Sequence, residues 1–288
     1  MSPKSKFHVG FVGVGRLGSA IAANLLRAGF PLTVSDVQEH AVAGLVALGA
    51  SAARSPAEVA AASDVIGICV RDDAQVLDVV GGKGGLLERI RPGSVLILHS
   101  TTHPDTCRQV EEMCRARGAE FIDVEVSGYV EKALTGELTL LMGGQEEVVA
   151  RCEPYLRAIG GESFHLGPVG MGSIAKLANN VMAIIGSLGT YEGLNVARAN
   201  SIDVDKMVEV AFMCSGDSNA LRQWKVQGWK HGPKPDPFEI LGSNSVYVLG
   251  VALKVARQRG IDLPVVAAVL DVVDRLRQEK AVSAAANR

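Results

Sequence analysis

The segment HVGFVGVGRLGSAIAANLLRAGFPLTVSD, residues 8–36, restricts the fold of this chain more than any other part of its 288 residues. A short apolar run leads into Gly13, Gly15 and Gly18, apolar residues at helical spacing come next, and a second apolar run ends at Asp36. This order predicts a strand, a helix and a second, parallel strand. The three glycines suit a tight turn, close approach of the backbone to a pyrophosphate, and close packing of helix on strand. The segment therefore predicts a Rossmann-type unit that binds a dinucleotide, against the alternative of a purely structural glycine turn.

The same segment indicates which dinucleotide is bound. Arg16 and Leu17 lie between the last two glycines, at the start of the predicted helix, where backbone N–H groups favour a phosphate. The carboxylate of Asp36 can accept hydrogen bonds from the ribose diol of adenosine, and it would repel a 2′-phosphate. Residues 37–39 contain no arginine that would bind such a phosphate. The sequence therefore predicts NAD rather than NADP as the cofactor.

The next segments alternate between strand-like and helix-like patterns. Strands are predicted over residues 50–53, 65–70, 94–99 and 120–124, and helices are predicted to begin at Pro56, Asp73 and Pro104. This alternation predicts an α/β fold with an N-terminal, doubly wound Rossmann sheet. In such sheets the ligand lies across the carboxyl ends of the strands.

Polar residues come directly after two of these predicted strands. Arg71 follows one strand, and Ser100 and Thr101 follow the next. Hydroxyl groups at these strand ends can bind a nicotinamide or a substrate carboxylate. They can equally belong to a turn that caps the helix beginning at Pro104, and the residues alone leave both interpretations open.

Two histidines in the second of these segments raise the question of a metal site. His99 and His103 are four residues apart, but they lie in a loop before a proline rather than on a helix face. No cluster of acids or cysteines accompanies them in the sequence. We therefore predict no metal site.

Residues 123–144, DVEVSGYVEKALTGELTLLMGG, predict the end of a strand, a turn at Ser127 and Gly128, a short helix and a further strand. Backbone amides at a Ser-Gly turn can hold a carboxylate. An ordinary glycine turn is the alternative, and the sequence does not exclude it.

Residues 167–201 predict one long helix, because apolar residues recur at helical spacing after a glycine-rich start and no proline interrupts them. Roughly thirty residues would span about 45 Å, long enough to run between two domains. Lys176, Asn179 and Asn180 share one face near its start. The predicted division is a Rossmann domain over 1–166, an interdomain helix over 167–201 and a helical C-terminal domain over 202–288, with helices at 205–213, 238–259 and 263–277.

Charge and cysteine content exclude several classes of function. Lys and Arg number 29 against 31 Asp and Glu, for a net charge of −2, and no long basic run occurs. These values argue against nucleic acid or a membrane surface as the partner and favour a small metabolite. The first residues lack an apolar signal core, and no apolar run reaches the length of a membrane span. Five cysteines without a CxxC pair predict reduced thiols and a cytoplasmic protein.

Four motifs in this order resemble the β-hydroxyacid dehydrogenases, which include 3-hydroxyisobutyrate dehydrogenase and tartronate semialdehyde reductase and are related to 6-phosphogluconate dehydrogenase. The motifs are GVGRLGSAIAANLLRAG, STTHP, DVEVSG with TGELTLLMGG, and GPVGMGSIAKLANN. The resemblance extends from Gly10 to about Pro264. It implies an N-terminal Rossmann domain, a long interdomain helix, an all-helical C-terminal domain and a homodimer or homotetramer.

The resemblance also implies roles for individual residues. Lys176 matches the family's catalytic lysine, which passes a proton to or from the substrate hydroxyl while a hydride moves to or from the nicotinamide. The residues that match substrate-orienting and carboxylate-binding positions are Ser127, Gly128, Asn179 and Asn180. The residues that match segments near the cofactor are Val70, Arg71, Ser100 and Thr101. Burial and the positive end of the helix dipole are both expected to lower the pKa of Lys176.

The sequence departs from the family's pattern at four places, one of them a pair of residues. Tyr247 and Val248 stand where a Lys-Asp pair is usual, Tyr129 replaces a glycine of the substrate loop, Glu125 replaces a proline, and His99 replaces an acid. We expect Tyr129 and Tyr247 to line the substrate site and to admit a larger or aromatic substituent. Drift without functional consequence is the alternative.

The predicted activity is NAD-dependent interconversion of a β-hydroxy acid and its semialdehyde or keto acid. The alternatives are reduction of an imine or another carbonyl compound and a cofactor-binding scaffold without turnover. The retained Lys176 argues against the imine reaction, and the missing Lys-Asp pair is what raises the possibility of a scaffold.

Overall fold

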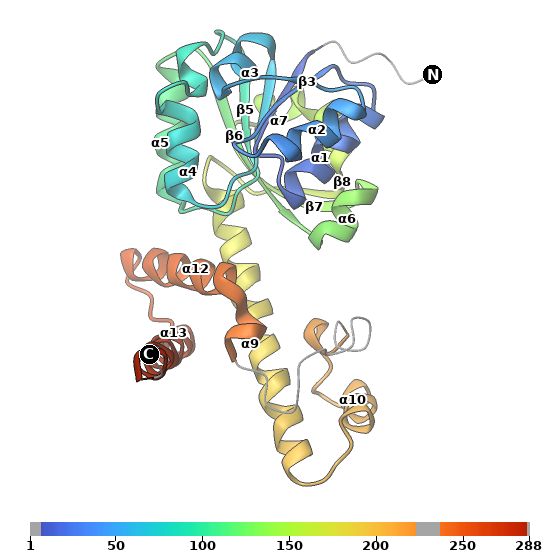
Figure 1. Cartoon of the computed structure of the whole chain (residues 1–288), viewed down its shortest axis with the longest axis vertical. Helices are drawn as coiled ribbons and strands as arrows, with labels where there is room; N and C mark the ends of the chain where they lie inside the picture. Colours follow the sequence, from blue (N-terminus) through green and yellow to red (C-terminus); the bar gives the residue numbers. More distant parts are fainter. Residues whose placement is uncertain (1–6, 223–236, 287–288) are drawn as a thin grey trace. The chain divides into compact units, whose positions relative to one another are not determined.

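The computed structural model describes residues 7–222 and 237–286. Contacts within the chain divide it into two compact units, Met1–Lys176 and Leu177–Arg288. The division falls inside one helix, α9 (Met171–Ala199), so this helix belongs to both units. Figure 1 shows both units and labels most of their helices and strands.

Unit 1 is built on a sheet of eight strands in the order β3-β2-β1-β4-β5-β6-β7-β8. Neighbouring strands are parallel except β6 and β7, which are antiparallel. The strands are β1 (Val9–Val12), β2 (Leu32–Ser35), β3 (Ser51–Ala52), β4 (Val65–Ile68), β5 (Val95–Leu98), β6 (Glu120–Ser127), β7 (Leu138–Gly143) and β8 (Gly160–His165). The strand order reverses between β1 and β4, and in doubly wound sheets the ligand binds at such a reversal. The predicted α/β fold is confirmed.

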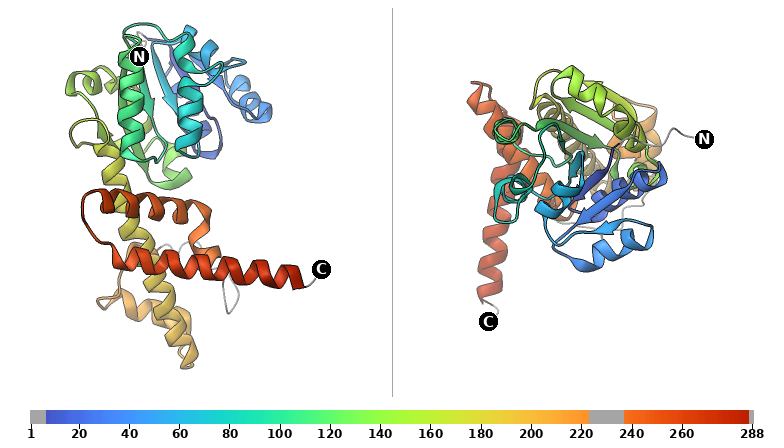
Figure 2. Two further views of the ribbon diagram at one scale, coloured as in Figure 1. Left: turned by 90° about the vertical axis from the view of Figure 1, so that its left-hand side faces the viewer. Right: turned by 90° about the horizontal axis from the view of Figure 1, so that it is seen from above.

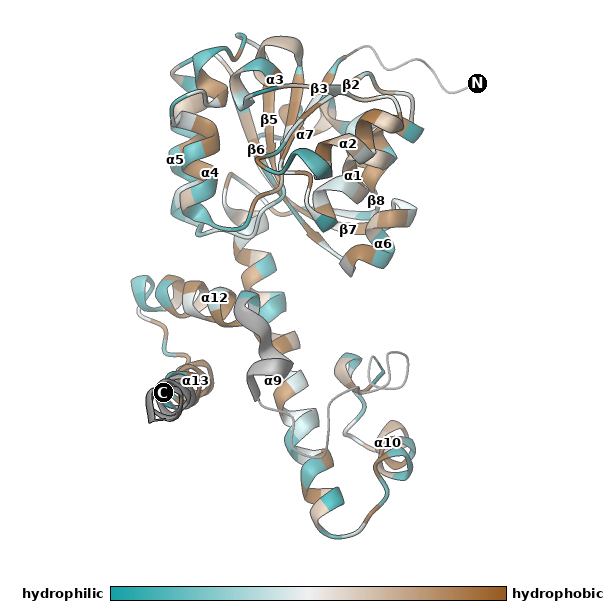
Figure 3. Cartoon of the chain, in the orientation of Figure 1, coloured by the Kyte–Doolittle hydropathy of each residue, from teal (hydrophilic) through white to brown (hydrophobic). Residues whose placement is uncertain are grey.

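Helices cover both faces of this sheet (Figures 1 and 2). They are α1 (Arg16–Arg27), α2 (Glu39–Ala47), α3 (Pro56–Ala62), α4 (Asp73–Gly81), α5 (Pro104–Arg115), α6 (Tyr129–Thr135), α7 (Glu146–Arg151) and α8 (Glu153–Ile159), with a 3-10 turn at Leu86–Glu88. One buried cluster joins α1, α2 and α8 to the sheet and includes Phe11, Leu25 and Tyr155. A second cluster joins α3, α4 and α5 to the opposite face and includes Ile66 and Val110. The central strands are accordingly apolar along their length (Figure 3).

Unit 2 is helical where the structure describes it. It contains most of α9 together with α10 (Val204–Phe212), α12 (Pro237–Gln258) and α13 (Pro264–Ala286). One apolar cluster packs α9 against α12 through Leu177, Val248 and Ala252. Another packs α9 against α10 and includes Leu194 and Val208. Among the described residues, no helix has the length and apolar character that crossing a bilayer requires.

The elements differ from the sequence prediction mainly at their ends. Strands β4 and β5 end earlier than predicted, at Ile68 and Leu98, whereas β6 continues to Ser127 because it pairs with β7. Helices α7 and α8 and strand β8 were not predicted. Helix α13 continues to Ala286, well beyond residue 277, since its alanine-rich end contains no helix breaker.

Candidate active site

The loop after β1 and the start of α1 together contain three glycines. The fold requires glycine at two of these positions, and at the third the structure leaves open space beside the backbone. Gly13 has φ +87°, and a Cβ there would overlap the carbonyl oxygen of Cys69. A Cβ at Gly18 would overlap the carbonyl oxygen of Gly13, so α1 could no longer pack against the loop. At Gly15 no atom lies within 4 Å of an added Cβ, and no side chain caps the start of α1. The loop therefore presents free backbone N–H groups beside open space, which suits a pyrophosphate.

Asp36 lies next to this loop at the carboxyl end of β2. One carboxylate oxygen accepts a hydrogen bond from the backbone N–H of Val14 at 2.7 Å, and the other accepts one from Gln38 at 2.9 Å. These bonds hold the acid beside the glycine turn. Its position is the one that contacts an adenosine ribose in Rossmann folds.

The ends of β4 and β5 are tied together by a side chain. The hydroxyl of Ser100 is buried and accepts a hydrogen bond from the backbone N–H of Val70 at 2.8 Å. Thr101 donates from its hydroxyl to a carboxylate oxygen of Glu125 at 3.0 Å. Arg71 is exposed, and its backbone N–H donates to the side chain of Gln75 at 3.0 Å. Ser100 therefore holds the loop that follows β4, while Thr101 contacts Glu125 on β6.

A buried acid anchors the start of α9 to the sheet. Asp123, on β6, accepts hydrogen bonds from the backbone N–H of Gly170 at 2.7 Å and of Ser173 at 3.0 Å. The Ser173 hydroxyl donates to the carbonyl of Thr102 at 2.5 Å. Burial raises the pKa of Asp123, and the backbone hydrogen bonds act against this rise. Sequence reasoning missed Asp123, although an acid inside an apolar strand was a usable signal.

This anchor places Lys176 one turn further along α9, over the end of β6. The ammonium nitrogen of Lys176 donates to the carbonyl of Val126 at 2.6 Å. Burial lowers the pKa of Lys176, and the nearby charge of Glu125 opposes this effect. Val126 is followed by Ser127, which ends β6, and by Gly128, which has φ +135°. The structure thus brings Lys176 close to the predicted carboxylate-binding turn.

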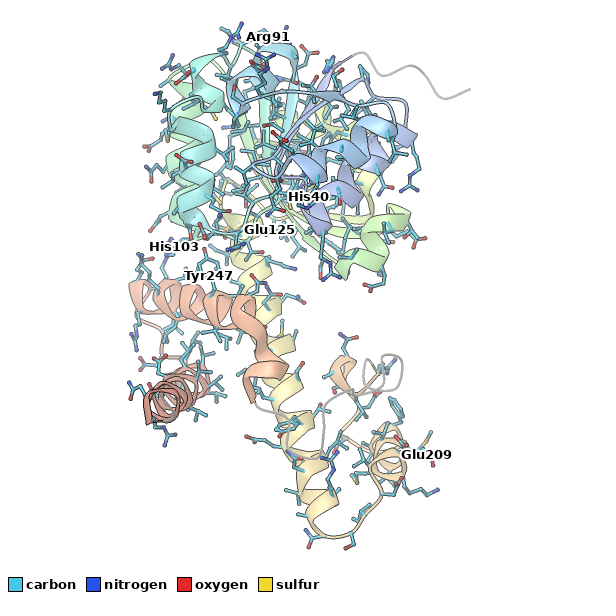
Figure 4. The ribbon with its side chains drawn as sticks, viewed as in Figure 1. His40, Arg91, His103, Glu125, Glu209 and Tyr247 are labelled. Carbon is cyan, nitrogen blue, oxygen red and sulfur yellow. The ribbon has the colours of Figure 1, made fainter. Side chains whose placement is uncertain are left out.

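Glu125 is the second ionisable group at this point (Figure 4). It lies between Asp123 and Ser127 on one face of β6, since alternate residues of a strand point the same way. Its side chain is 0% exposed, and one carboxylate oxygen has no hydrogen-bond partner among the described residues. Burial raises the pKa of Glu125 to about 8; the charge of Lys176 lowers it, and the charge of Asp123 adds to the rise. Sequence reasoning identified Glu125 only as a departure from the family pattern.

The other predicted substrate residues are less closely tied to this centre. Asn179 is exposed and Asn180 is half-buried, on the turn of α9 that comes after Lys176. Tyr129 begins α6, and its side chain lies outside what the structure describes. Tyr247 is half-buried and packs against the cluster that joins α9 to α12, within unit 2.

The two histidines have structural roles. The ring of His99 is stacked between Phe11 and Tyr155, with ring centroids 6.0 and 5.8 Å away. Its Nδ1 donates to the carbonyl of Val124 at 2.9 Å, and its Nε2 accepts from the Tyr155 hydroxyl at 2.8 Å. Burial lowers the pKa of His99 to about 4. His99 therefore lies in the core rather than in the site, which corrects its grouping with the other departures near the substrate. His103 caps α5. The described residues contain no group of three or more acids, histidines and cysteines that could hold a metal ion.

Comparisons with known proteins cover nearly the whole chain. Residues 8–167 match the family profile described as the NAD binding domain of 6-phosphogluconate dehydrogenase. Residues 170–286 match the one described as NAD-binding of NADP-dependent 3-hydroxyisobutyrate dehydrogenase. The NAD-dependent L-serine dehydrogenase of Pseudomonas aeruginosa is 36% identical over 213 residues, which are 74% of this chain and 72% of that protein. The mitochondrial 3-hydroxyisobutyrate dehydrogenase of Mus musculus is 34% identical over 215 residues, 75% of this chain and 64% of that protein.

Solved structures agree. The 3-hydroxyisobutyrate dehydrogenase of Salmonella typhimurium superimposes with a TM-score of 0.81 over 95% of both chains, at 28% identity. An imine reductase variant from Myxococcus stipitatus, with a TM-score of 0.66 and 22% identity over 96% of this chain and 95% of that one, shares the fold.

Proposed function

Because the chain belongs to the β-hydroxyacid dehydrogenase family, we propose that Lys176 is the general acid/base with which this NAD-dependent oxidoreductase interconverts a β-hydroxy acid and its semialdehyde or keto acid. The observation that carries this proposal is a half-buried lysine at the end of β6. Its ammonium nitrogen lies 2.6 Å from the carbonyl of Val126, immediately before the Ser127-Gly128 turn.

The residues around the glycine loop fit NAD. The open space at Gly15 admits a pyrophosphate at the start of α1, and the anchored carboxylate of Asp36 suits a ribose diol. Two further groups of residues are assigned to the cofactor. The residues that follow β4 and β5 at the same edge of the sheet border the nicotinamide half, and they are Val70, Arg71, Ser100 and Thr101. The loop residues Gly13, Arg16, Leu17 and Gly18 contact the phosphates.

When bound, NAD supplies the hydride acceptor for oxidation of the alcohol carbon. Lys176, as a neutral amine, accepts the proton of the substrate hydroxyl, and as an ammonium it returns this proton in the reverse reaction. A lowered pKa enlarges the fraction of neutral amine at neutral pH. Ser127 and Gly128 hold the substrate carboxylate, and Asn179 and Asn180 orient the substrate from the next turn of α9.

The substrate is proposed to be larger than the usual small hydroxy acid, with Tyr129 and Tyr247 beside it. The missing Lys-Asp pair supports this proposal, because Tyr247 and the buried Val248 cannot bind an anionic group as a lysine does. The packing of Tyr247 in the cluster between α9 and α12 is the competing explanation for that residue.

The test is absorbance at the reduced-nicotinamide band with NAD and β-hydroxy acids graded from small aliphatic to aromatic. We expect turnover that falls by about 10²- to 10⁴-fold in Lys176→Ala, the usual contribution of a general acid/base. Lys206→Ala, an exposed lysine of α10, is the matched control and keeps full activity. Turnover that survives in Lys176→Ala contradicts the assigned role, and cofactor binding without turnover on any acid favours the scaffold.

We also propose a homo-oligomer in a reducing compartment such as the cytoplasm. All five cysteines are free, which suits such a compartment. Met182 and Val196 are 69% and 65% exposed on α9, and exposed apolar side chains on one helix face support contact with a second copy.

A further inference from the structure

We propose that Ser173 is a positioning residue, which holds Lys176 at a fixed distance from the β5 loop, residues 100–103. This inference rests on the proposed function, in which Lys176 exchanges a proton with the substrate and the β5 loop borders the nicotinamide half of the cofactor site. It assigns a task to a buried hydroxyl group that has no part in the proposed contacts to substrate or cofactor.

Each residue of the β5 loop forms a hydrogen bond with a different part of unit 1. Ser100, Thr101 and His103 bond to the loop after β4, to β6 and to the start of α4. The remaining residue, Thr102, bonds to α9, because its carbonyl oxygen accepts from the hydroxyl of Ser173 at 2.5 Å. Ser173 therefore joins the β5 loop to the helix that carries Lys176.

The hydroxyl of Ser173 is used across the fold rather than within its own helix. Ser173 and Thr102 are both 0% exposed. A serine inside a helix often donates to the carbonyl four residues earlier, as Ser187 of α9 does to Ala183 at 2.8 Å. Ser173 instead reaches a carbonyl 71 residues away in the sequence. Because a buried carbonyl is costly to leave without its hydrogen bond, this contact resists separation of the β5 loop from α9.

The backbone around Ser173 is fixed to the sheet as well. The N–H of Ser173 donates to the carboxylate of Asp123 on β6 at 3.0 Å. A Cβ added at Gly172 would lie 2.5 Å from the carbonyl oxygen of Leu141, so the helix backbone passes very close to β7. Lys176 comes three residues after Ser173 and lies next to it on the helix surface. A displacement of Ser173 therefore displaces the lysine.

The distance between the β5 loop and α9 matters because the reaction needs two acceptors at once. In oxidation the alcohol carbon gives a hydride to NAD, the hydroxyl gives its proton to the neutral amine of Lys176, and a carbonyl group forms. The β5 loop borders the first acceptor, and α9 carries the second. A displacement of about 1 Å between reacting groups can reduce a rate by about 100-fold. Ser173 therefore acts on turnover and has little effect on cofactor binding.

The first test is Ser173→Ala, which removes the hydroxyl and favours the helix. With NAD and the best β-hydroxy acid of the graded panel, kcat is expected to fall about 10- to 100-fold, while KM for NAD stays within about twofold. Ser187→Ala, the same change later in α9, is the matched control and keeps kcat. Calorimetric melting shows whether each variant is folded at the assay temperature. A lower melting temperature with unchanged kcat overturns the proposal.

Ser173→Cys separates the hydrogen bond from the volume of the side chain. A thiol occupies the place of the hydroxyl but is a weak donor, so kcat is expected to fall in this variant too. Full kcat in Ser173→Cys would mean that the shape of the side chain is sufficient, and it would overturn the proposal.

A double variant tests whether Ser173 acts through the lysine. If it does, Ser173→Ala costs little once the lysine is absent, and Lys176→Ala has nearly the same kcat with or without Ser173→Ala. A residue that only stabilises the fold would lower kcat by the same factor in both backgrounds. Effects that simply multiply therefore contradict the role of Ser173.

Labelling of Lys176 by trinitrobenzenesulfonate, followed by peptide mass spectrometry of the full chain, needs no turnover. At a pH above the pKa of the lysine, the rate reports how well the reagent reaches this half-buried amine. Labelling is expected to be severalfold faster in Ser173→Ala, because the first turn of α9 is released, and to keep the wild-type rate in Ser187→Ala. An unchanged rate in Ser173→Ala overturns the proposal.

The two proposals fail separately. Turnover that survives in Lys176→Ala, or the absence of turnover on any acid, removes the catalytic role of Lys176, and the labelling rate then decides whether Ser173 holds the lysine. Turnover that depends on Lys176 but is unchanged in Ser173→Ala leaves the proposed function intact and removes the role of Ser173.

Discussion

Burial lowers the pKa of two residues of this chain, His99 and Lys176, in different surroundings. His99 is surrounded by aromatic rings and satisfied hydrogen bonds, and its lowered pKa keeps it neutral in the core. Lys176 is half-buried; its ammonium donates to a carbonyl oxygen, and the charge of Glu125 opposes the effect of burial on its pKa. Desolvation lowers both pKa values, but only the proposed role of Lys176 requires its side chain to exchange a proton.

His99 makes the stability of the protein depend on pH. Unfolded, it binds a proton near pH 6.5; folded, it does so only near 4. The unfolded state therefore binds more protons between these values, and the stability contributed by neutral His99 is complete above pH 6.5 and is lost as the pH falls toward 4. The loss amounts to about 3 kcal/mol. Urea unfolding of wild type at a series of pH values measures it.

A phenylalanine at this position removes the titration. His99→Phe is expected to be less stable at every pH, because Tyr155 and the Val124 carbonyl lose their partner, but to lose less stability between pH 6.5 and 4. His40→Gln, at an exposed residue of α2, keeps the wild-type dependence. An equally steep decline in His99→Phe would contradict this account.

At the scale of elements, the start of α1 and the start of α9 are held by different means. The first uses glycines, since side chains at Gly13 and Gly18 would strike backbone carbonyl oxygens. The second uses a buried acid, Asp123, whose oxygens accept from the backbone N–H groups of Gly170, just before the helix, and of Ser173 in its first turn. The backbone N–H groups at the start of α1 therefore stay available to a ligand, whereas those at the start of α9 are bonded to Asp123.

Two glycine variants separate folding from cofactor binding. Gly18→Ala is expected to destabilise unit 1 by a few kcal/mol, because its Cβ meets the backbone of Gly13. Gly15→Ala is expected to keep the melting temperature, since nothing in the protein lies near its Cβ, and to weaken NAD binding at least tenfold. Calorimetric melting and titration with NAD measure both effects. Normal NAD affinity in Gly15→Ala would place the pyrophosphate elsewhere.

At the scale of the whole molecule, the chain consists of an α/β unit and a helical unit that share α9. The contact division lies between Lys176 and Leu177, inside the segment predicted as the interdomain helix. The predicted boundaries at 1–166, 167–201 and 202–288 stay a prediction.

Self-association is expected to depend on α9. Met182 and Val196 are about four turns apart and therefore lie on one face of the helix. Val196→Glu places a charge on this face and is expected to weaken self-association at least tenfold, about 1.4 kcal/mol. Lys206→Glu adds a charge to α10 as the control. Sedimentation at several concentrations distinguishes the variants, and unchanged association of Val196→Glu would exclude this face from the interface.

The local pattern of residues was sufficient to predict three features of the chain. They are the strand–helix–strand unit, the acid Asp36 at its end, and the shared helix face of Lys176, Asn179 and Asn180. These features depend on spacing within one or two elements, and spacing is visible in a sequence. The fold class is predicted by the same alternation of patterns.

Pairing between distant segments decided the rest. Glu125 contacts Thr101, 24 residues away, and Lys176 reaches Val126 across 50 residues. No periodicity encodes such contacts, because strand order and the antiparallel pairing of β6 with β7 bring these residues together. The same packing buries His99 and Glu125, and desolvation by that burial is what shifts their pKa values.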